Sequence, residues 1–167
     1  MDASWSGLWI AVVGVAGTLG AAVLTQSRAD RARRMESQSE NLERRRSCYI
    51  TLNTAARQYL TEMGNYLHAL QHDEGVAASL ENLESARMTY RDSYAEAQMI
   101  VPNAVLGASR AAKKRLNHAY GDLKTYGAEP SRYAGELANL ERHLHQEVWP
   151  SVGALRKSMR ADLGVDD

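Results

Sequence analysis

The stretch that decides the fold runs from residue 48 to residue 70 and reads CYITLNTAARQYLTEMGNYLHAL. Apolar and aromatic side chains recur in it at steps of three and four residues, which is the period of one face of an α-helix. These positions are Tyr49, Leu52, Ala56, Tyr59, Met63, Tyr66 and Leu70. The pattern predicts an amphipathic helix whose apolar face packs against other helices.

Toward the N-terminus, the same helix is expected to continue as a polar helical stalk over residues 25–46. Met35 and Leu42 are almost the only large apolar residues there, and both lie on the seven-residue grid that contains Tyr49. Neither proline nor glycine stands between residues 21 and 63, so no local signal interrupts the helix.

The apolar stretch 5–24 contains twenty residues without a charge, which matches a hydrocarbon core roughly 30 Å thick. A secretory signal would place bases before this stretch, whereas the leader 1–4 holds Asp2 and no base. A phosphate-binding glycine loop would need a following Lys-Ser/Thr pair, which is missing. A buried core helix is the third alternative, but the remaining chain is too small to surround one. We therefore expect a transmembrane helix over 5–24 after a short extracytoplasmic leader.

Positive charge follows the apolar stretch, at Arg28, Arg31, Arg33 and Arg34. Such residues stay on the cytoplasmic side and attract anionic lipid headgroups. We therefore expect a single-pass protein of the cell membrane, bound to the lipid bilayer, with its N-terminus outside and its C-terminal domain in the cytoplasm. The single cysteine, Cys48, cannot form an intrachain disulfide, which suits a reducing cytoplasm.

Small residues line one face of the expected membrane helix, at heptad spacing. They are Gly7, Ala11, Gly14, Thr18 and Ala21. Small side chains let two helices approach closely in lipid, so this stripe predicts self-association through transmembrane packing. The alternative is that glycine and alanine are simply common in membrane helices.

Three more amphipathic segments follow, over 76–97, 105–126 and 133–163. Turn signals separate the segments at 71–75, at Pro102-Asn103 and at 126–131, of which Pro102-Asn103 predicts either a turn or a sharp kink. We therefore expect an all-α fold in which the transmembrane helix and stalk lead into an antiparallel four-helix (or helical-hairpin) bundle over 47–163, with a tail at 164–167. A parallel coiled coil between chains is the alternative, but three turns favour local hairpins.

Two details of the bundle follow from composition. Pro150 predicts a bend in the last segment rather than a stop, because the apolar stripe keeps its phase across it. The chain has eight tyrosines and no phenylalanine, so tyrosines are expected to supply the large aromatic packing.

Candidate catalytic and metal-binding residues are few. His68 and His72 share a helix face, and His143 and His145 flank Leu144, but the two pairs are not expected to converge into the four ligands of a closed metal site. The sequence contains no Glu-x-x-His and no His-Glu-x-x-His. Histidines paired with neighbouring glutamates on the solvent side are the favoured interpretation.

Cys48 lacks the signature of a nucleophile and is expected to be a packed thiol. We therefore expect neither an enzyme nor a cofactor.

Two basic clusters, 44–46 and 113–115, raise the question of nucleic acid. The formal net charge is zero, whereas nucleic-acid-binding domains are usually strongly basic. The second cluster is expected to be a solvated helix face, and nucleic acid is not an expected partner.

The motifs VVGVAGTLGAAVLTQ (12–26), RRRSCYITLNTAARQYL (44–60) and YAEAQMIVP (94–102) resemble uncharacterised small single-pass membrane proteins of high-GC Gram-positive bacteria. The resemblance implies a bacterial setting, and sixteen arginines to four lysines agree with it. It implies no activity, ligand or catalytic residue.

The function hypothesis is a membrane-anchored helical scaffold or adaptor that contacts itself or another membrane or cytoplasmic protein. One alternative is an oligomeric membrane effector that changes permeability through its packed anchors. A second alternative is a metal-binding or enzymatic helical bundle.

Overall fold

The computed structural model describes the backbone of residues 5–165 and the side chains of Arg31 and of residues 33–165. Within that part of the chain every regular element is a helix, which confirms the all-α prediction. The elements are α1 (Trp5–His72), α2 (Val76–Ile100), α3 (Asn103–Ala128), α4 (Ala134–His143), a π-helical turn η1 (Leu144–Val148) and α5 (Trp149–Asp162).

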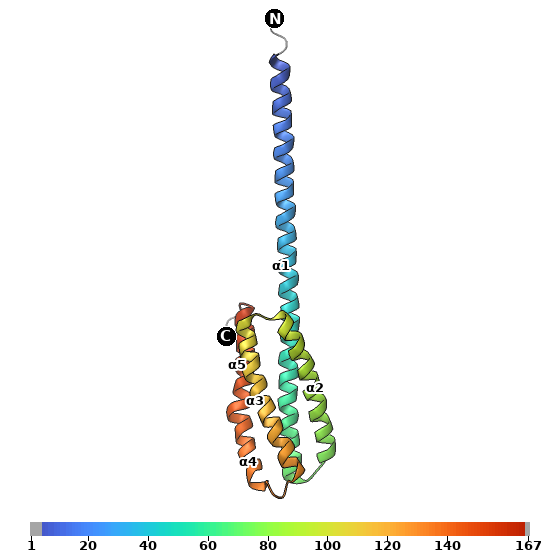
Figure 1. Cartoon of the computed structure of the whole chain (residues 1–167), viewed down its shortest axis with the longest axis vertical. Coiled ribbons are helices and arrows are strands. Elements are labelled where there is room, and N and C mark those ends of the chain that lie inside the picture. The colour runs from blue at the N-terminus through green and yellow to red at the C-terminus, as the bar shows by residue number, and fades with distance from the viewer. Residues whose placement is uncertain (1–4, 166–167) are drawn as a thin grey trace. The chain divides into compact units, whose positions relative to one another are not determined.

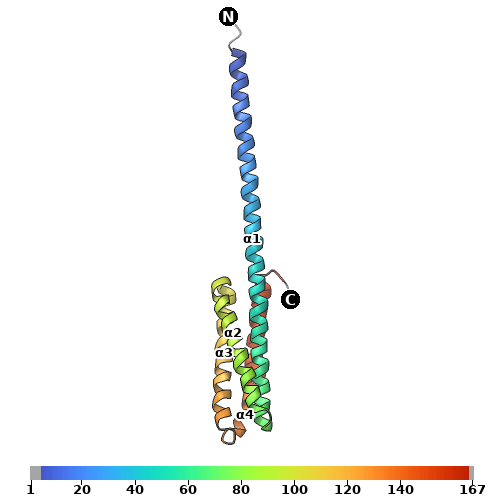
Figure 2. The same ribbon diagram turned by 90° about the vertical axis from the view of Figure 1, so that its right-hand side faces the viewer.

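The chain divides into two compact units, Met1–Glu43 and Arg44–Asp167, and α1 contributes to both. In the second unit the C-terminal part of α1, then α2, α3 and the continuous run α4–η1–α5 lie side by side and alternate in direction (Figures 1 and 2). This arrangement is an antiparallel four-helix bundle with short connections, as the turn signals predicted.

The apolar stripe of residues 48–70 forms one wall of the core. All seven of its predicted positions are buried, and Leu52, Tyr59 and Met63 have no exposed surface. The other helices contribute their own buried stripes, which include Leu83, Tyr90, Leu116, Leu123, Leu137, Leu144, Val152 and Leu155. Because each fully buried aliphatic side chain stabilises the fold by about 1.5–3 kcal/mol, the interlocking of the four stripes is the main cohesive force.

The connections have identifiable local causes. Between α1 and α2 the backbone turns through left-handed residues, with φ of 53° at Asp73 and 63° at Gly75, where glycine carries no Cβ penalty. Val101 is extended ahead of Pro102, since the proline ring disfavours helical geometry in the preceding residue. The chain therefore breaks between α2 and α3 and does not merely kink.

The last segment stays helical through Pro150 and does not end there. Proline has no N–H to donate, and its ring clashes with the carbonyl one turn earlier. The helix accommodates this with a π-helical turn, in which the Trp149 amide donates to the carbonyl of Leu144, five residues back. Leu144, Val148 and Val152 all remain buried, so the apolar stripe keeps its phase as predicted.

The predictions about the N-terminal region fall largely on residues that are not described. The leader 1–4 lies outside the described residues, as do the side chains of Gly7, Ala11, Gly14, Thr18, Ala21 and Arg28, although the α1 backbone is helical from Trp5 onward. Arg31, Arg33 and Arg34 are exposed. Among the residues whose side chains are described, no helix is both long and apolar enough to span a membrane.

Candidate functional site

The candidate site is a groove between α1 and the α4–η1–α5 run, with a volume of about 340 Å³. Its walls come from Leu60, Thr61, Gly64, Leu67, His68, Gln71, Glu141, Leu144, His145 and Trp149. We call this set the π-turn groove, because η1 supplies part of one wall. Single-turn π-helical insertions occur frequently at functional sites.

Gly64 leaves the α1 side of the groove open. A Cβ built at this glycine would meet no atom within 4 Å, so the space beside it is open. Leu60, Leu67 and Leu144 are buried and provide an apolar lining, whereas Trp149 is 37% exposed. The lining therefore combines apolar surface with an accessible indole.

Polar side chains surround this apolar lining. Gln71 Nε2 donates a hydrogen bond of 3.4 Å to Glu141 Oε2 and so links α1 to α4. The rings of His68 and His72 lie 4.1 Å apart by their centroids, and His72 Nδ1 is 2.9 Å from the carbonyl oxygen of His68. Such a site can hold an apolar side chain and offer hydrogen bonds around it.

His143 and His118 lie outside the groove and contact each other. His143 is 3.5 Å from Glu147, which confirms the predicted pairing, but its side chain is only 24% exposed, so the predicted solvent-facing position is wrong. Its ring meets the ring of His118 edge to face at 5.9 Å, and His118 is 3.8 Å from Asp122. His143 lies three residues after the buried Leu140 and so shares its side of the helix, whereas His145 is exposed.

The pair His118 and His143 borders a second, shallower hollow of about 190 Å³ between α3 and α4. Its other lining residues are Asp122, Tyr126, Glu136, Asn139 and Leu140. Within the described part of the chain, no three His, Cys, Asp or Glu side chains are placed to hold a metal ion.

Tyrosines form the aromatic centre of the bundle, as their number predicted. Tyr59 of α1 stacks on Tyr90 of α2 at 5.6 Å, and it lies 6.3 Å from Tyr120 of α3. Burial raises the pKa of Tyr59 and of Tyr90 above the usual value, so both phenols stay protonated. Neither hydroxyl has a hydrogen-bond partner among the described residues.

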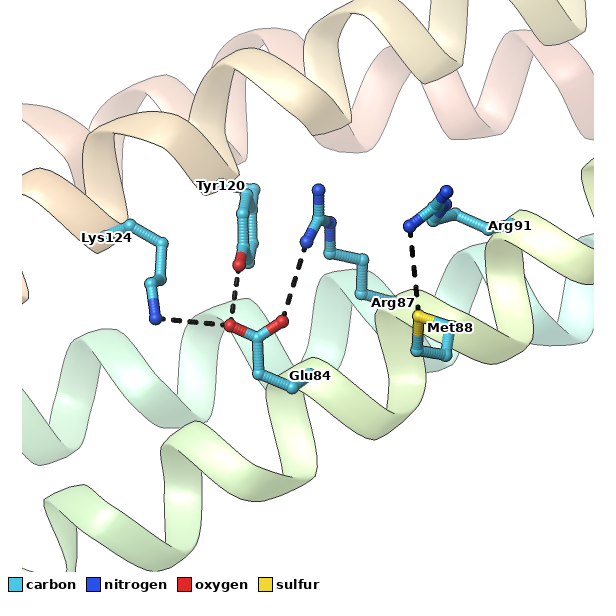
Figure 3. A network of polar contacts seen from close by, with 6 residues as sticks. All are labelled: Glu84, Arg87, Met88, Arg91, Tyr120 and Lys124. Carbon is cyan, nitrogen blue, oxygen red and sulfur yellow. Dashed lines mark hydrogen bonds and ion pairs between the residues drawn. The ribbon is translucent and has the colours of Figure 1, made fainter.

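Tyr120, by contrast, belongs to a polar network centred on Glu84 of α2 (Figure 3). Its hydroxyl donates to Glu84 Oε1 at 2.6 Å, and the Lys124 ammonium lies 3.2 Å from the same oxygen. The Arg87 guanidinium is 3.6 Å from Glu84 Oε2 and stands 4.0 Å above the centre of the Tyr120 ring. Arg87 is therefore held by an ion pair with Glu84 and by a cation–π contact with Tyr120.

The charges of this network set its protonation. Burial alone would raise the pKa of Glu84, but the hydrogen bonds from Tyr120 and Lys124 outweigh it and hold this pKa below 4.5. Burial, together with the hydrogen bond to Glu84, raises the pKa of Tyr120 to about 12. Around neutral pH Glu84 is therefore ionised and Tyr120 is protonated, which is the combination that the hydrogen bond between them requires.

The C-terminal end of α5 is tied to α1 by a similar arrangement. Tyr49 donates to Asp162 Oδ2 at 2.7 Å, and Arg45 NH1 lies 3.1 Å from the same oxygen. The neighbouring Cys48 is 3% exposed, which confirms the packed thiol. Burial and then the charge of Glu96 raise the pKa of Cys48, which disfavours the nucleophilic thiolate.

The basic cluster 113–115 is only partly the solvated face that was predicted. Lys114 and Arg115 are exposed, and Arg115 lies 3.9 Å from Glu147. The Lys113 ammonium instead stands 4.1 Å above the ring of Tyr94 on α2, so this charge helps to join α2 to α3.

The groove and the Glu84 network were not predicted from the sequence. Their residues come from different helices, and single residues such as Gly64, Glu84 and Tyr120 carry no local motif. On α1 the groove residues Leu60, Gly64, Leu67 and Gln71 follow helical spacing and share one face, but this spacing does not show that the face borders a groove. Comparisons of the chain with family models, with characterised proteins and with solved structures found no match.

Proposed function

We propose that this chain is a membrane-anchored helical scaffold or adaptor that acts through protein–protein contacts, without catalysis. In this proposal residues 5–24 cross the membrane, Arg28, Arg31, Arg33 and Arg34 keep the following domain in the cytoplasm, and the bundle receives a partner. The protein is single-pass, and the bilayer and a membrane or cytoplasmic protein are its partners.

The observation that carries this proposal is the π-turn groove. Its 340 Å³ lies at the small end of the range for ligand sites and suits one or two inserted side chains. An accessible aromatic residue such as Trp149 is a typical binding anchor at protein interfaces. The occupant in this proposal is a segment of a partner protein that inserts an aliphatic or aromatic side chain beside Gly64.

The test places a photo-crosslinking residue at Thr61 or at His145, both of which line the groove, in the full chain in its native membranes. Lys114, which is exposed on α3 and outside the groove, is the matched control position. Both groove positions should capture the same protein, and position 114 should not.

The decisive variant is Gly64→Met. The new side chain enters open space and should fill the groove, while methionine favours a helix over glycine by roughly 0.8 kcal/mol. The fold should therefore persist while the capture at 61 and 145 disappears. Capture that survives Gly64→Met, or that is equal at position 114, contradicts the proposal.

A further inference from the structure

The segment 31–43 of α1 presents apolar side chains to solvent. Among its described residues every side chain is exposed, and Met35 and Leu42 remain 71% and 43% exposed. Most helix stability in proteins comes from packing an apolar face, and apolar side chains exposed along a helix are positions at which another helix can pack. Met35 and Leu42 are therefore candidates for contact with another helix.

Heptad positions can be assigned from these two residues. With Met35 and Leu42 at d, the intervening a position is Ser39, a small residue that allows close approach. The flanking g positions are then Arg31 and Gln38, and the flanking e positions are Glu36 and Glu43. One flank carries a base and the other carries two acids.

This charge distribution selects an orientation. In a parallel, in-register pair each g residue faces the e residue of the next heptad in the partner helix, so Arg31 faces Glu36 of the second copy. In an antiparallel pair e faces e and g faces g, which brings Glu36 and Glu43 toward acids. The charges are therefore complementary only in the parallel arrangement.

We propose that residues 31–43 form a parallel, in-register two-stranded coiled coil with a second copy of this chain. Tyr49, the next d residue, is 3% exposed inside the bundle. From Tyr49 onward the d residues therefore pack within one chain, whereas Met35 and Leu42 would pack against the second copy. Toward the N-terminus the same seven-residue grid passes through Arg28, which interrupts it, and then through Ala21, Gly14 and Gly7 of the predicted small-residue stripe.

The first test is cysteine scanning of the full chain in membranes, in a Cys48→Ala background that removes the one native thiol. In a parallel coiled coil the two copies of an a or d residue lie within disulfide reach of each other, whereas the two copies of a residue on the outer face do not. Single cysteines at Met35, Ser39 and Leu42 should form crosslinked dimers on oxidation. Cysteines at Ser37, Asn41 and Arg44, on the outer face, should not.

The second test exchanges the charges, with the Leu42→Cys crosslink as the readout. Arg31→Glu alone and Glu36→Arg alone should each lower the crosslinked fraction by about fivefold, since two pairs are affected per dimer. The double exchange should restore it. The proposal is overturned if all six positions crosslink equally or if Met35, Ser39 and Leu42 do not crosslink. It is also overturned if the single charge exchanges have no effect. Capture at the groove positions 61 and 145 is a separate readout, so a failure here is distinguishable from a failure of the adaptor function.

Discussion

The hydroxyl of Tyr120 on α3 donates a 2.6 Å hydrogen bond to Glu84 on α2, and the Tyr120 ring also lies 4.0 Å beneath the Arg87 guanidinium. One side chain thus engages both members of an ion pair. Tyr59 lies 6.3 Å from the same ring and has no hydrogen-bond partner for its own hydroxyl among the described residues. Tyr59 is fully buried and Tyr120 is partly buried, but their rings are neighbours and only the Tyr120 hydroxyl has a partner, so removing each hydroxyl in turn isolates the contribution of that hydrogen bond.

Tyr120→Phe should destabilise the bundle by about 1 kcal/mol, because it removes a hydrogen bond to a charged, partly exposed acceptor. Tyr59→Phe should cost less than about 0.5 kcal/mol or stabilise slightly, since no partner loses a bond. Urea unfolding followed by circular dichroism measures both. Equal losses would mean that the Glu84 contact contributes nothing beyond ring packing.

The contribution of Glu84 should depend on pH with a definite sign. Its pKa is lower in the folded chain than the ordinary 4.5, so the carboxylate stabilises the fold above that value. This contribution is lost as the pH falls below 4.5 and through the folded pKa. The stability difference between the native chain and Glu84→Gln should therefore shrink in acid, as measured by urea midpoints at a series of pH values. A difference that stays constant across that range contradicts the assigned shift.

The second unit, Arg44–Asp167, should fold when expressed alone without detergent. Its four apolar stripes bury one another, and among the residues whose side chains are described none N-terminal to Cys48 belongs to the core. Circular dichroism should show a predominantly helical spectrum, and thermal unfolding should be cooperative. A disordered spectrum or obligate aggregation would mean that the apolar faces need another chain or the bilayer.

Gly127→Ala should destabilise the bundle by about 1–3 kcal/mol, because the new methyl group would overlap the Tyr66 hydroxyl. The loss should be smaller in a Tyr66→Phe background. The control is Gly121→Ala on the same helix, where a Cβ meets nothing within 4 Å and helix propensity should add about 0.5–1 kcal/mol. Thermal unfolding of the four variants measures the coupling, and identical behaviour of the two glycines would refute the close approach.

Replacing Gly14 and Ala21 by leucine should weaken self-association in a membrane dimerisation reporter and preserve insertion, since bulk blocks close helix approach. Val13 and Leu19, which point elsewhere on the helix, are the control positions for exchange to other large apolar residues. If both pairs behave alike, the small stripe is compositional. A parallel loss of any membrane-leakage phenotype would favour the permeability effector over the adaptor.

The sequence by itself determined the helices and their order, because the signals for these are local. The stripe from Tyr49 to Leu70 has the helical period, Pro102 disfavours helix in the residue before it, and the stripe across Pro150 keeps its phase. All three predictions are confirmed by the burial of the stripe, the break after Ile100 and the continuity through η1.

Only the tertiary structure decided which side chains meet across helices. Glu84 and Tyr120 are separated by 36 residues, and Arg45 and Asp162 by 117, so no local pattern relates them. The partly buried position of His143 and the place of Gly64 beside a groove also depend on which helices lie next to them, and no local pattern specifies that. Periodicity specifies which face of a helix is buried, whereas the rotation and axial shift of each helix against its neighbours depend on packing among all four stripes at once.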